Sequence, residues 1–187
     1  MSKATARLTL GVVILALTAR AAAGEPAQRS IDAAKSRARF SVSHLWVERV
    51  IGTVPILSGS VILAPGSIIP TSVTAVLDAT RIETGEPDRD KSLRSPDFFD
   101  AQKFPTWAFA STKITPNGPN AFEMDGNLTI HGVAQLERLQ VTAPGDVAHP
   151  VYNASAEINR HAFGMTVTRL DSTIGATANV ALEIALK

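Results

Sequence analysis

Hydrophobic and polar residues alternate with a period of two along most of this chain. Over residues 37–47, for example, Phe40, Val42, His44 and Trp46 share one face, and an arginine and two serines lie on the other. Such alternation is typical of β-strands with one buried face. It predicts eight strands: Arg37–Val47, Val54–Leu63, Ser72–Ala79, Thr106–Ile114, Ala121–Ile130, Leu136–Thr142, Val151–Arg160 and Ile174–Leu186.

Turn-forming residues separate the predicted strands. Several gaps are short and contain Gly, Pro or Asn, as at His131-Gly132, which fits antiparallel hairpins. Eight antiparallel strands in one domain form a closed barrel or a two-sheet sandwich. The last strand places the small residues Ala176 and Ala178 on one face with larger aliphatic residues, and only 5% of the chain is aromatic. Because small inward residues leave space, we expect an all-β, eight-stranded antiparallel barrel with room for one small ligand.

Residues 81–104 lack this alternation and carry many charges. Within them, Ser95-Pro96-Asp97 has the composition of a helix start, with Ser as the N-cap and Pro at the first helical position. We therefore expect a long connection with short helical turns. It should cross one end of the barrel and control access to the interior.

The densest charge of the chain lies in this connection, over residues 83–94. We expect Arg89 and Asp90 to pair locally, and Thr84 and Asp88 to cap turns. General acid–base chemistry by these side chains is the alternative, although no nucleophile with an orienting base adjoins them.

Two groups of side chains are candidates for the lining of the interior. Phe98, Phe99 and Phe104 lie close together in the connection, and Phe is costly to expose, so they should pack inward as a plug or rim. They would form either a satellite core under the loop or the lining of a ligand mouth. His44, which shares a face with Phe40, is either a core histidine bound by a carbonyl or carboxylate, or a polar contact for a ligand head group.

The first 23 residues have a different character. Lys3 and Arg7 form a basic start, the apolar run Leu8–Thr18 follows, and small residues end the segment at Ala23. This is the pattern of a secretory signal peptide, since a retained membrane anchor would need about 20 apolar residues. We predict a signal peptide at 1–23, a single mature domain at 24–187, and a periplasmic location with no stable membrane span after cleavage.

Composition narrows the chemistry further. The chain has 18 Lys and Arg against 17 Asp and Glu, a formal charge of +1, and loss of the signal peptide would leave 15 bases and 17 acids. Such a balance gives no field to attract nucleic acid. The chain has no Cys, its four His lack metal-binding spacing, and phosphate loops and serine hydrolase motifs are absent. We expect no nucleic-acid partner, no metal, no required cofactor and no catalytic residues.

Several short motifs follow one another in a fixed order. They are Phe40–Leu45, Gly52-Thr53, Gly59, Ile82–Gly85, Arg89-Asp90, Leu93–Ser95, Asp97–Asp100, Phe104-Pro105, Phe109–Ser111, Gly126–Gly132, Ile158–Arg160 and Phe163–Met165. In this order and spacing the chain resembles the YceI-like, polyisoprenoid-binding periplasmic proteins over nearly all of its mature part. It departs from them at Ser92, where the family usually has His, and at Val54, Ile56 and Leu57, which replace aromatic residues. These departures bear on the identity of the ligand and not on the barrel.

The resemblance implies a lipocalin-like barrel that binds a lipid without catalysis. The lipid would be a long-chain isoprenoid of the quinone or polyprenyl type, or a fatty amide, held for carriage, storage or stress response. Strand parity, the phenylalanine cluster and the resemblance together give the candidate ligand-binding residues: Phe40, Val42, His44, Trp46, Phe98, Phe99, Phe109 and Ala178. Two other functions stay open, a periplasmic enzyme acting on a lipid or small metabolite and an interaction scaffold with a filled barrel. A homodimer through an exposed face is compatible with all three.

Overall fold

The computed structural model of the chain describes residues 24–45, 48–166 and 171–187. The predicted signal peptide and Trp46 lie outside these residues. The strands are β1 (Ala27–Ser30), β2 (Arg37–His44), β3 (Glu48–Thr53), β4 (Ile56–Leu63), β5 (Pro70–Asp78), β6 (Thr106–Pro116), β7 (Ala121–Ile130), β8 (Val133–Thr142), β9 (Val151–Asn159) and β10 (Ile174–Ala185). The helices are α1 (Pro87–Arg94) and the 3-10 helices η1 (Ala79–Arg81), η2 (Arg160–Phe163) and η3 (Asp171–Thr173).

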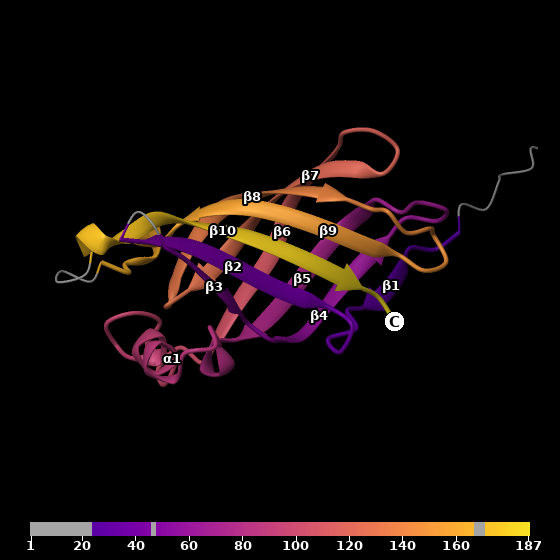
Figure 1. Cartoon of the computed structure of the whole chain (residues 1–187). Helices are drawn as coiled ribbons and strands as arrows, with labels where there is room; N and C mark the ends of the chain where they lie inside the picture. Colours follow the sequence, from indigo (N-terminus) through magenta and orange to yellow (C-terminus); the bar gives the residue numbers. More distant parts are fainter. Residues whose placement is uncertain (1–23, 46–47, 167–170) are drawn as a thin grey trace, which may run out of the picture.

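All ten strands belong to one antiparallel sheet in the order β1-β4-β5-β6-β7-β8-β9-β10-β2-β3. The sheet curls on itself (Figure 1). The β1 end of the sheet meets β10 where Ile31, just after β1, forms a bridge with Leu186, just after β10. The backbone N–H of Ile31 also donates to the carbonyl of Gly59 at 3.0 Å, which ties this junction to β4. The prediction of an all-β antiparallel barrel is confirmed, whereas the predicted number of eight strands is wrong.

The two additional strands are β1 and β3, at the two ends of the sheet. Closure is less complete than predicted, because in the described residues the outer edge of β3 carries one bridge, between Thr53 and Glu83. Exposed charges at Glu48 and Arg49 protect this edge from pairing with another chain. The strand predicted from Val54 begins at Ile56 instead, after a proline, which cannot donate to the ladder.

Tight turns set the register of the neighbouring hairpin strands. Ile130 of β7 pairs with Val133 of β8, so only His131 and Gly132 form the loop between them. Both have positive φ angles, 53° and 74°, as a type I′ turn requires. The Asn or Asp that favours such a turn is replaced here by His131, whose ring packs edge-on against Phe104 at 5.1 Å between centroids.

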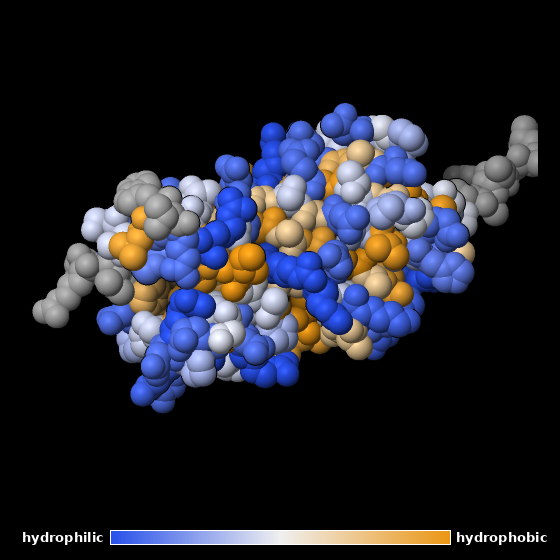
Figure 2. Space-filling model, in the orientation of Figure 1, coloured by the Kyte–Doolittle hydropathy of each residue, from blue (hydrophilic) through white to orange (hydrophobic). Residues whose placement is uncertain are grey.

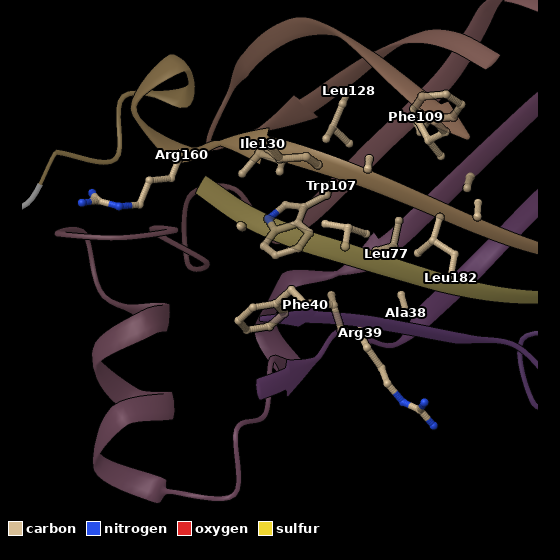
Figure 3. A pocket seen from close by; sticks show the side chains of 18 of the residues that line it. Ala38, Arg39, Phe40, Leu77, Trp107, Phe109, Leu128, Ile130, Arg160 and Leu182 are labelled. Carbon is tan, nitrogen blue, oxygen red and sulfur yellow. The ribbon is translucent and has the colours of Figure 1, made fainter. Parts of the chain in front are cut away.

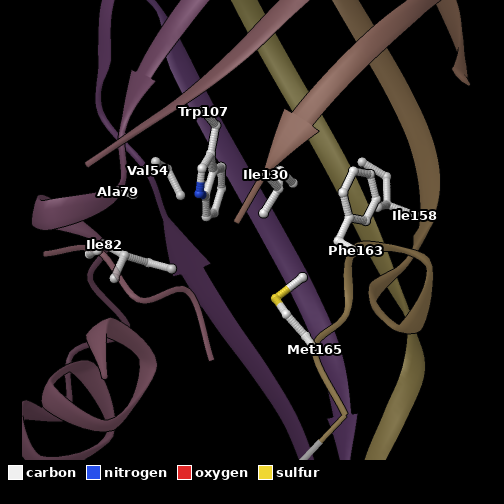
Figure 4. Packing of buried hydrophobic residues seen from close by; sticks show 9 residues of the cluster. Val54, Ala79, Ile82, Trp107, Ile130, Ile158, Phe163 and Met165 are labelled. Atoms are coloured by element: carbon white, nitrogen blue, oxygen red, sulfur yellow. The ribbon is translucent and has the colours of Figure 1, made fainter. Parts of the chain in front are cut away.

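The inward faces of the strands build the core. One cluster gathers near α1 around Trp107, Ile82, Phe163 and Met165, none of which is more than 9% exposed (Figure 4). Two others line the opposite half of the barrel. Each buried aliphatic side chain contributes about 1.5–3 kcal/mol relative to an exposed one, and no disulfide assists a chain without Cys.

The long connection after β5 begins its helix earlier than predicted. Glu86 is the N-cap of α1, its side chain accepts from the Asp88 N–H at 3.2 Å, and Pro87 occupies the first turn. Ser95, the predicted start, is the C-cap instead. Ser and Pro favour helix starts, but Glu86-Pro87-Asp88 carries a similar signal nine residues earlier and is followed by better helix formers. Asp88 therefore lies in the first turn and does not cap it.

The surface carries no single dominant apolar area on the face shown in Figure 2, where hydrophobic groups are separated by hydrophilic ones. Exposed large hydrophobic residues are scattered over several elements, for example Leu45 in the β2–β3 turn, Ile51 in β3 and Leu136 in β8. Within the described residues, no helix has the length and apolar character needed to cross a membrane.

Candidate ligand cavity

A cavity of about 390 Å³ runs inside the barrel. Every strand from β2 to β10 contributes to its wall, together with α1 and the segment that follows it. The side chains that face it are mostly aliphatic or aromatic, among them Leu77, Trp107, Leu128 and Leu182 (Figure 3). Its volume falls within the range of about 300–1,000 Å³ typical of small-molecule sites. The open cavity does not support the filled-barrel alternative.

Most candidate ligand-binding residues lie on this cavity. Seven of the eight line it: Phe40, Val42, His44, Phe98, Phe99, Phe109 and Ala178. The eighth, Trp46, falls outside the described residues. The structure thus brings together residues from strands at opposite ends of the sequence and from the connection around α1. Their contact with a ligand stays a prediction.

Glycines on neighbouring strands position two of the aromatic rings. Phe40 of β2 is paired with Gly52 of β3, and a Cβ atom at Gly52 would lie only 2.3 Å from the ring. Likewise, a Cβ atom at Gly126 of β7 would lie 2.2 Å from the ring of Phe109 on β6. Aromatic rings that cover strand glycines in this way shield the backbone and pin the register. Both rings are thereby held on the cavity wall.

The phenylalanines of the connection have divided roles. Phe98 is buried and Phe99 packs against Trp107 at 4.7 Å between ring centroids, and both line the cavity. Phe104 instead lies over His131 and Gly132 at the β7–β8 turn. The cluster is therefore part lining and part satellite core, the two roles that the sequence left open.

The cavity is closed at the end opposite α1. Ile31 and Phe122 are buried there, and the Tyr152 hydroxyl, also buried, donates to the Ile68 carbonyl at 2.9 Å. Burial raises the pKa of Tyr152 to about 12, although the nearby Arg29 charge opposes this shift. Because the hydroxyl is already bonded, this end offers an apolar surface to a ligand.

The end near α1 carries the polar groups. His44 is half-buried, with its Nδ1 3.6 Å from the Glu48 carboxylate, so it is not the fully buried core histidine considered above. Arg89 donates from Nε to the Thr84 hydroxyl at 2.8 Å. That hydroxyl donates in turn to the buried Asp90 at 2.6 Å. The predicted direct pair between Arg89 and Asp90 is wrong, because Thr84 stands between the two groups.

A buried arginine fixes the chain segment beside this end. Arg160, 7% exposed, donates to the carbonyls of Gly175 and Ile174 at 3.0 Å and to the Asp171 carboxylate at 2.6 Å. His161 Nε2 lies 2.9 Å from the same carboxylate oxygen. Hydrogen bonds from Arg160 and His161 hold the pKa of Asp171 below its usual value of 3.8. These contacts join the end of β9 to the start of β10.

A model of the YceI-like domain family matches residues 30–186. The chain belongs to the YceI-like family. The match runs from the last residue of β1 to the residue after β10, so this YceI-like domain includes strands β2 to β10, the cavity and α1.

Relatives with related sequences are UPF0312 proteins. One from Vibrio vulnificus (strain YJ016) is 36% identical over 96 residues, which are 51% of this chain and 51% of that protein. The match thus spans about half the length of that relative. Another, from Shewanella baltica (strain OS185), is 28% identical over 150 residues, 80% of this chain and 78% of that protein.

Solved structures share the fold of the YceI-like chain. The crystal structure of Burkholderia cenocepacia BcnA matches with a TM-score of 0.76 and 22% identity, over 84% of this chain and 99% of that one. A polyisoprenoid binding domain from Saccharophagus degradans, implicated in plant cell wall breakdown, matches with a TM-score of 0.69 and 17% identity, over 85% of this chain and 97% of that one. These matches confirm the lipocalin-like architecture.

Sequence reasoning missed several residues of the YceI-like cavity. Trp107, Leu139 and Met165 line it, and so does Arg160. Trp107 and Leu139 occupy inward positions of predicted strands, so the alternation of inward and outward residues could have identified them. Arg160 directly follows β9 and Met165 lies in the loop after η2, where alternation gives no signal.

The chemistry of the cavity is that of a binding site. In the part of the chain that the structure describes, no group of three or more His, Asp or Glu side chains is placed to hold a metal ion. The indole N–H of Trp107 is buried and has no hydrogen-bond partner there, but its nitrogen is covered by neighbouring atoms. The arrangement is suited to bind an apolar chain along the barrel, with polar contacts confined to the α1 end.

Proposed function

We propose that this protein is exported to the periplasm and binds one long-chain lipid inside the barrel, for carriage, storage or stress response. The lipid is an isoprenoid of the quinone or polyprenyl type, or a fatty amide. The observation that carries the proposal is the apolar cavity of about 390 Å³, closed at one end by Ile31 and Tyr152. The polyisoprenoid binding domain from Saccharophagus degradans, which has the same fold, supports this ligand class.

The energetics favour a long apolar tail. Each methylene-sized unit that leaves water for an apolar wall contributes about 0.8 kcal/mol. Affinity per atom falls with ligand size, so this figure overestimates the total for a whole tail. Specificity then depends on the length of the cavity and on the few polar groups near α1.

A cavity-filling substitution with a matched control tests the proposal. Ala178 of β10 lines the cavity and pairs with Val42 and Ile158, whereas Ala181 of the same strand is exposed on the outer face. Ala178→Trp should obstruct the tail, and Ala181→Trp should not. Binding of quinones with a graded series of isoprenoid tails is followed through quenching of tryptophan fluorescence.

We expect the affinity of the unsubstituted protein to rise with tail length. In Ala178→Trp, exclusion of two methylene-sized units alone should weaken binding of long tails about tenfold. Ala181→Trp should bind like the unsubstituted protein. Thermal unfolding confirms that both variants fold. Equal affinities of the two variants for every tail would count against binding inside the barrel.

Export is tested separately. The N-terminal sequence of the protein recovered from a periplasmic fraction should begin at Gly24, after the small residues of the predicted cleavage site. Recovery of a chain that begins at Met1 from the cytoplasm would contradict the proposed location.

A further inference from the structure

Among the Lys, Arg, His, Asp and Glu residues that the structure describes, only the basic types line the cavity. In the described residues they are Arg39, His44, Arg89 and Arg160, and neither Asp nor Glu lines the cavity. Arg39 contributes through its backbone only, because its side chain points away from the cavity in Figure 3 and lies 3.4 Å from the exposed Glu183. The three others are at the end near α1, where the Arg160 side chain also points away from the cavity in Figure 3 and is bound to Asp171 and to backbone carbonyls.

Each of these three bases interacts, directly or through Thr84, with an acid that does not line the cavity. Glu48 lies 3.6 Å from His44, and Asp171 lies 2.6 Å from Arg160. Asp90 is linked to Arg89 through the Thr84 hydroxyl. Arg89 therefore contributes a positive charge to the cavity wall, and no Asp or Glu of the described residues lines that wall to oppose it. An apolar wall of low dielectric strengthens this local effect.

The Arg89 side chain is held in place by hydrogen bonds and keeps one donor for a ligand. Its Nε and one terminal nitrogen donate to the Thr84 hydroxyl and carbonyl, at 2.8 and 3.2 Å. Thr84 is itself held by Asp90, which accepts from its N–H at 2.8 Å and from its hydroxyl. The guanidinium is therefore fixed before binding, and among the described residues its second terminal nitrogen has no partner.

The position of Arg89 matches the end of an extended tail. The methyl group of Thr84 would lie 2.9 Å from a Cβ atom placed at Gly52, which also faces the Phe40 ring. Phe40, in turn, packs against the cluster that contains Trp107. A ligand tail that extends along the apolar interior of the barrel thus ends beside the second terminal nitrogen of the Arg89 guanidinium.

We propose that the ligand is a long-chain amphiphile with an anionic oxygen head group, a carboxylate or a phosphate monoester, which binds against Arg89 and His44. This inference rests on the proposed lipid binding, and it selects an anionic head group in place of the neutral quinone and amide. The tail points toward Tyr152 at the closed end. A charge-assisted hydrogen bond to a preorganised guanidinium favours such a head group over a neutral one of equal size.

The test compares ligands that share one saturated 16-carbon tail: hexadecanoate, hexadecyl phosphate, hexadecanamide and hexadecanol. Isothermal titration calorimetry at pH 8 measures their binding to the unsubstituted protein, to Arg89→Gln and to Arg39→Gln. Arg39→Gln is the matched control, since it removes the same charge from the outer face of the barrel. Arg89→Lys, which retains the charge, covers the case in which Arg89→Gln does not fold.

In the unsubstituted protein, one or both anions should bind about tenfold or more tightly than the alcohol and the amide. The anion that does so identifies the head group. Arg89→Gln should remove this preference and leave hexadecanol binding unchanged, whereas Arg39→Gln should retain it. Equal affinity for anions and neutral ligands, or equal effects of the two substitutions, would overturn the inference while leaving lipid binding intact. No binding of any of these saturated ligands would also overturn the inference, and the quinones with graded isoprenoid tails described above test lipid binding separately.

Discussion

Substitution of Gly126 by Ala tests whether the ring of Phe109 is held on the cavity wall by the absence of a side chain on β7. The added Cβ atom would lie 2.2 Å from the ring and 2.8 Å from the carbonyl oxygen of Ala110. Carbon atoms in contact prefer a separation of about 3.5–4.0 Å, so the ring must move by more than an ångström. Since Phe109 lines the cavity, the ring can move into that space.

Overpacking of this kind costs about 1–3 kcal/mol, and we expect about 2 kcal/mol here. For a domain of this size that corresponds to a fall in the thermal midpoint of about 4–8 °C. Equilibrium unfolding in urea measures the free energy directly. Gly175→Ala is the control, since its Cβ atom would meet no described atom closer than 3.4 Å, and its stability should change by less than about 0.5 kcal/mol.

A double-mutant cycle isolates the contact. In a Phe109→Leu background the ring is gone, so Gly126→Ala should cost less, with a coupling energy of about 1 kcal/mol or more. Additive effects of the two substitutions, within about 0.3 kcal/mol, would show that the ring and the glycine do not constrain each other.

Three further predictions concern ionisable groups. Absorbance titration of Tyr152, the single tyrosine, should give a pKa near 12. Its contribution to stability is then complete below pH 10 and is lost as the pH rises through 12. A titration midpoint near pH 10 would contradict its burial. Asp171→Asn should speed hydrogen exchange in the segment held by Arg160 and His161. In the unsubstituted protein, the contact of Asp171 with these two residues should persist above the usual pKa of 3.8 and be lost as the pH falls through the lowered pKa. Unchanged exchange in Asp171→Asn would show that the contact does not hold the segment. Burial raises the pKa of Glu137, so the contribution of this side chain to stability is lost as the pH rises and the carboxyl group ionises. Glu137→Gln should therefore raise the thermal midpoint at pH 8 and not at pH 3. Equal midpoints of the two proteins at pH 8 would contradict this.

The barrel could be predicted from alternation because its strands have one apolar and one polar face. Two strands, β1 and β3, were not predicted, for physical reasons. β1 has only four residues, too few to show a period, and β3 begins with Glu48 and Arg49 because it lies at an edge of the sheet. In the connection, the proline rule was sound but was applied to Pro96, although Pro87 begins the helix.

The candidate site divides in the same way. Parity placed Phe40, Val42 and Ala178 toward the interior, where they line the cavity. Ala176, which was expected on the same face, is exposed, because the pairing of β10 with β2 shifts register between Ile174 and Ala178. Such a bulge leaves no trace in a pattern of period two.

The role of Arg160 depends on carbonyl groups of residues up to 15 positions away. Long-range contacts to backbone atoms have no signature in residue type or spacing. The same holds for the chain from Asp90 through Thr84 to Arg89, whose members were identified while their geometry was not.

The central claim is that the barrel contains a lipid. It is tested most directly by mass spectrometry of an organic extract of the purified mature protein, with Ala178→Trp and Ala181→Trp purified in parallel. We expect about one molecule of a long-chain lipid per chain in the unsubstituted protein and in Ala181→Trp, and little or none in Ala178→Trp. Extracts that contain no such lipid, or the same amount of it in all three proteins, would refute lipid binding inside the barrel.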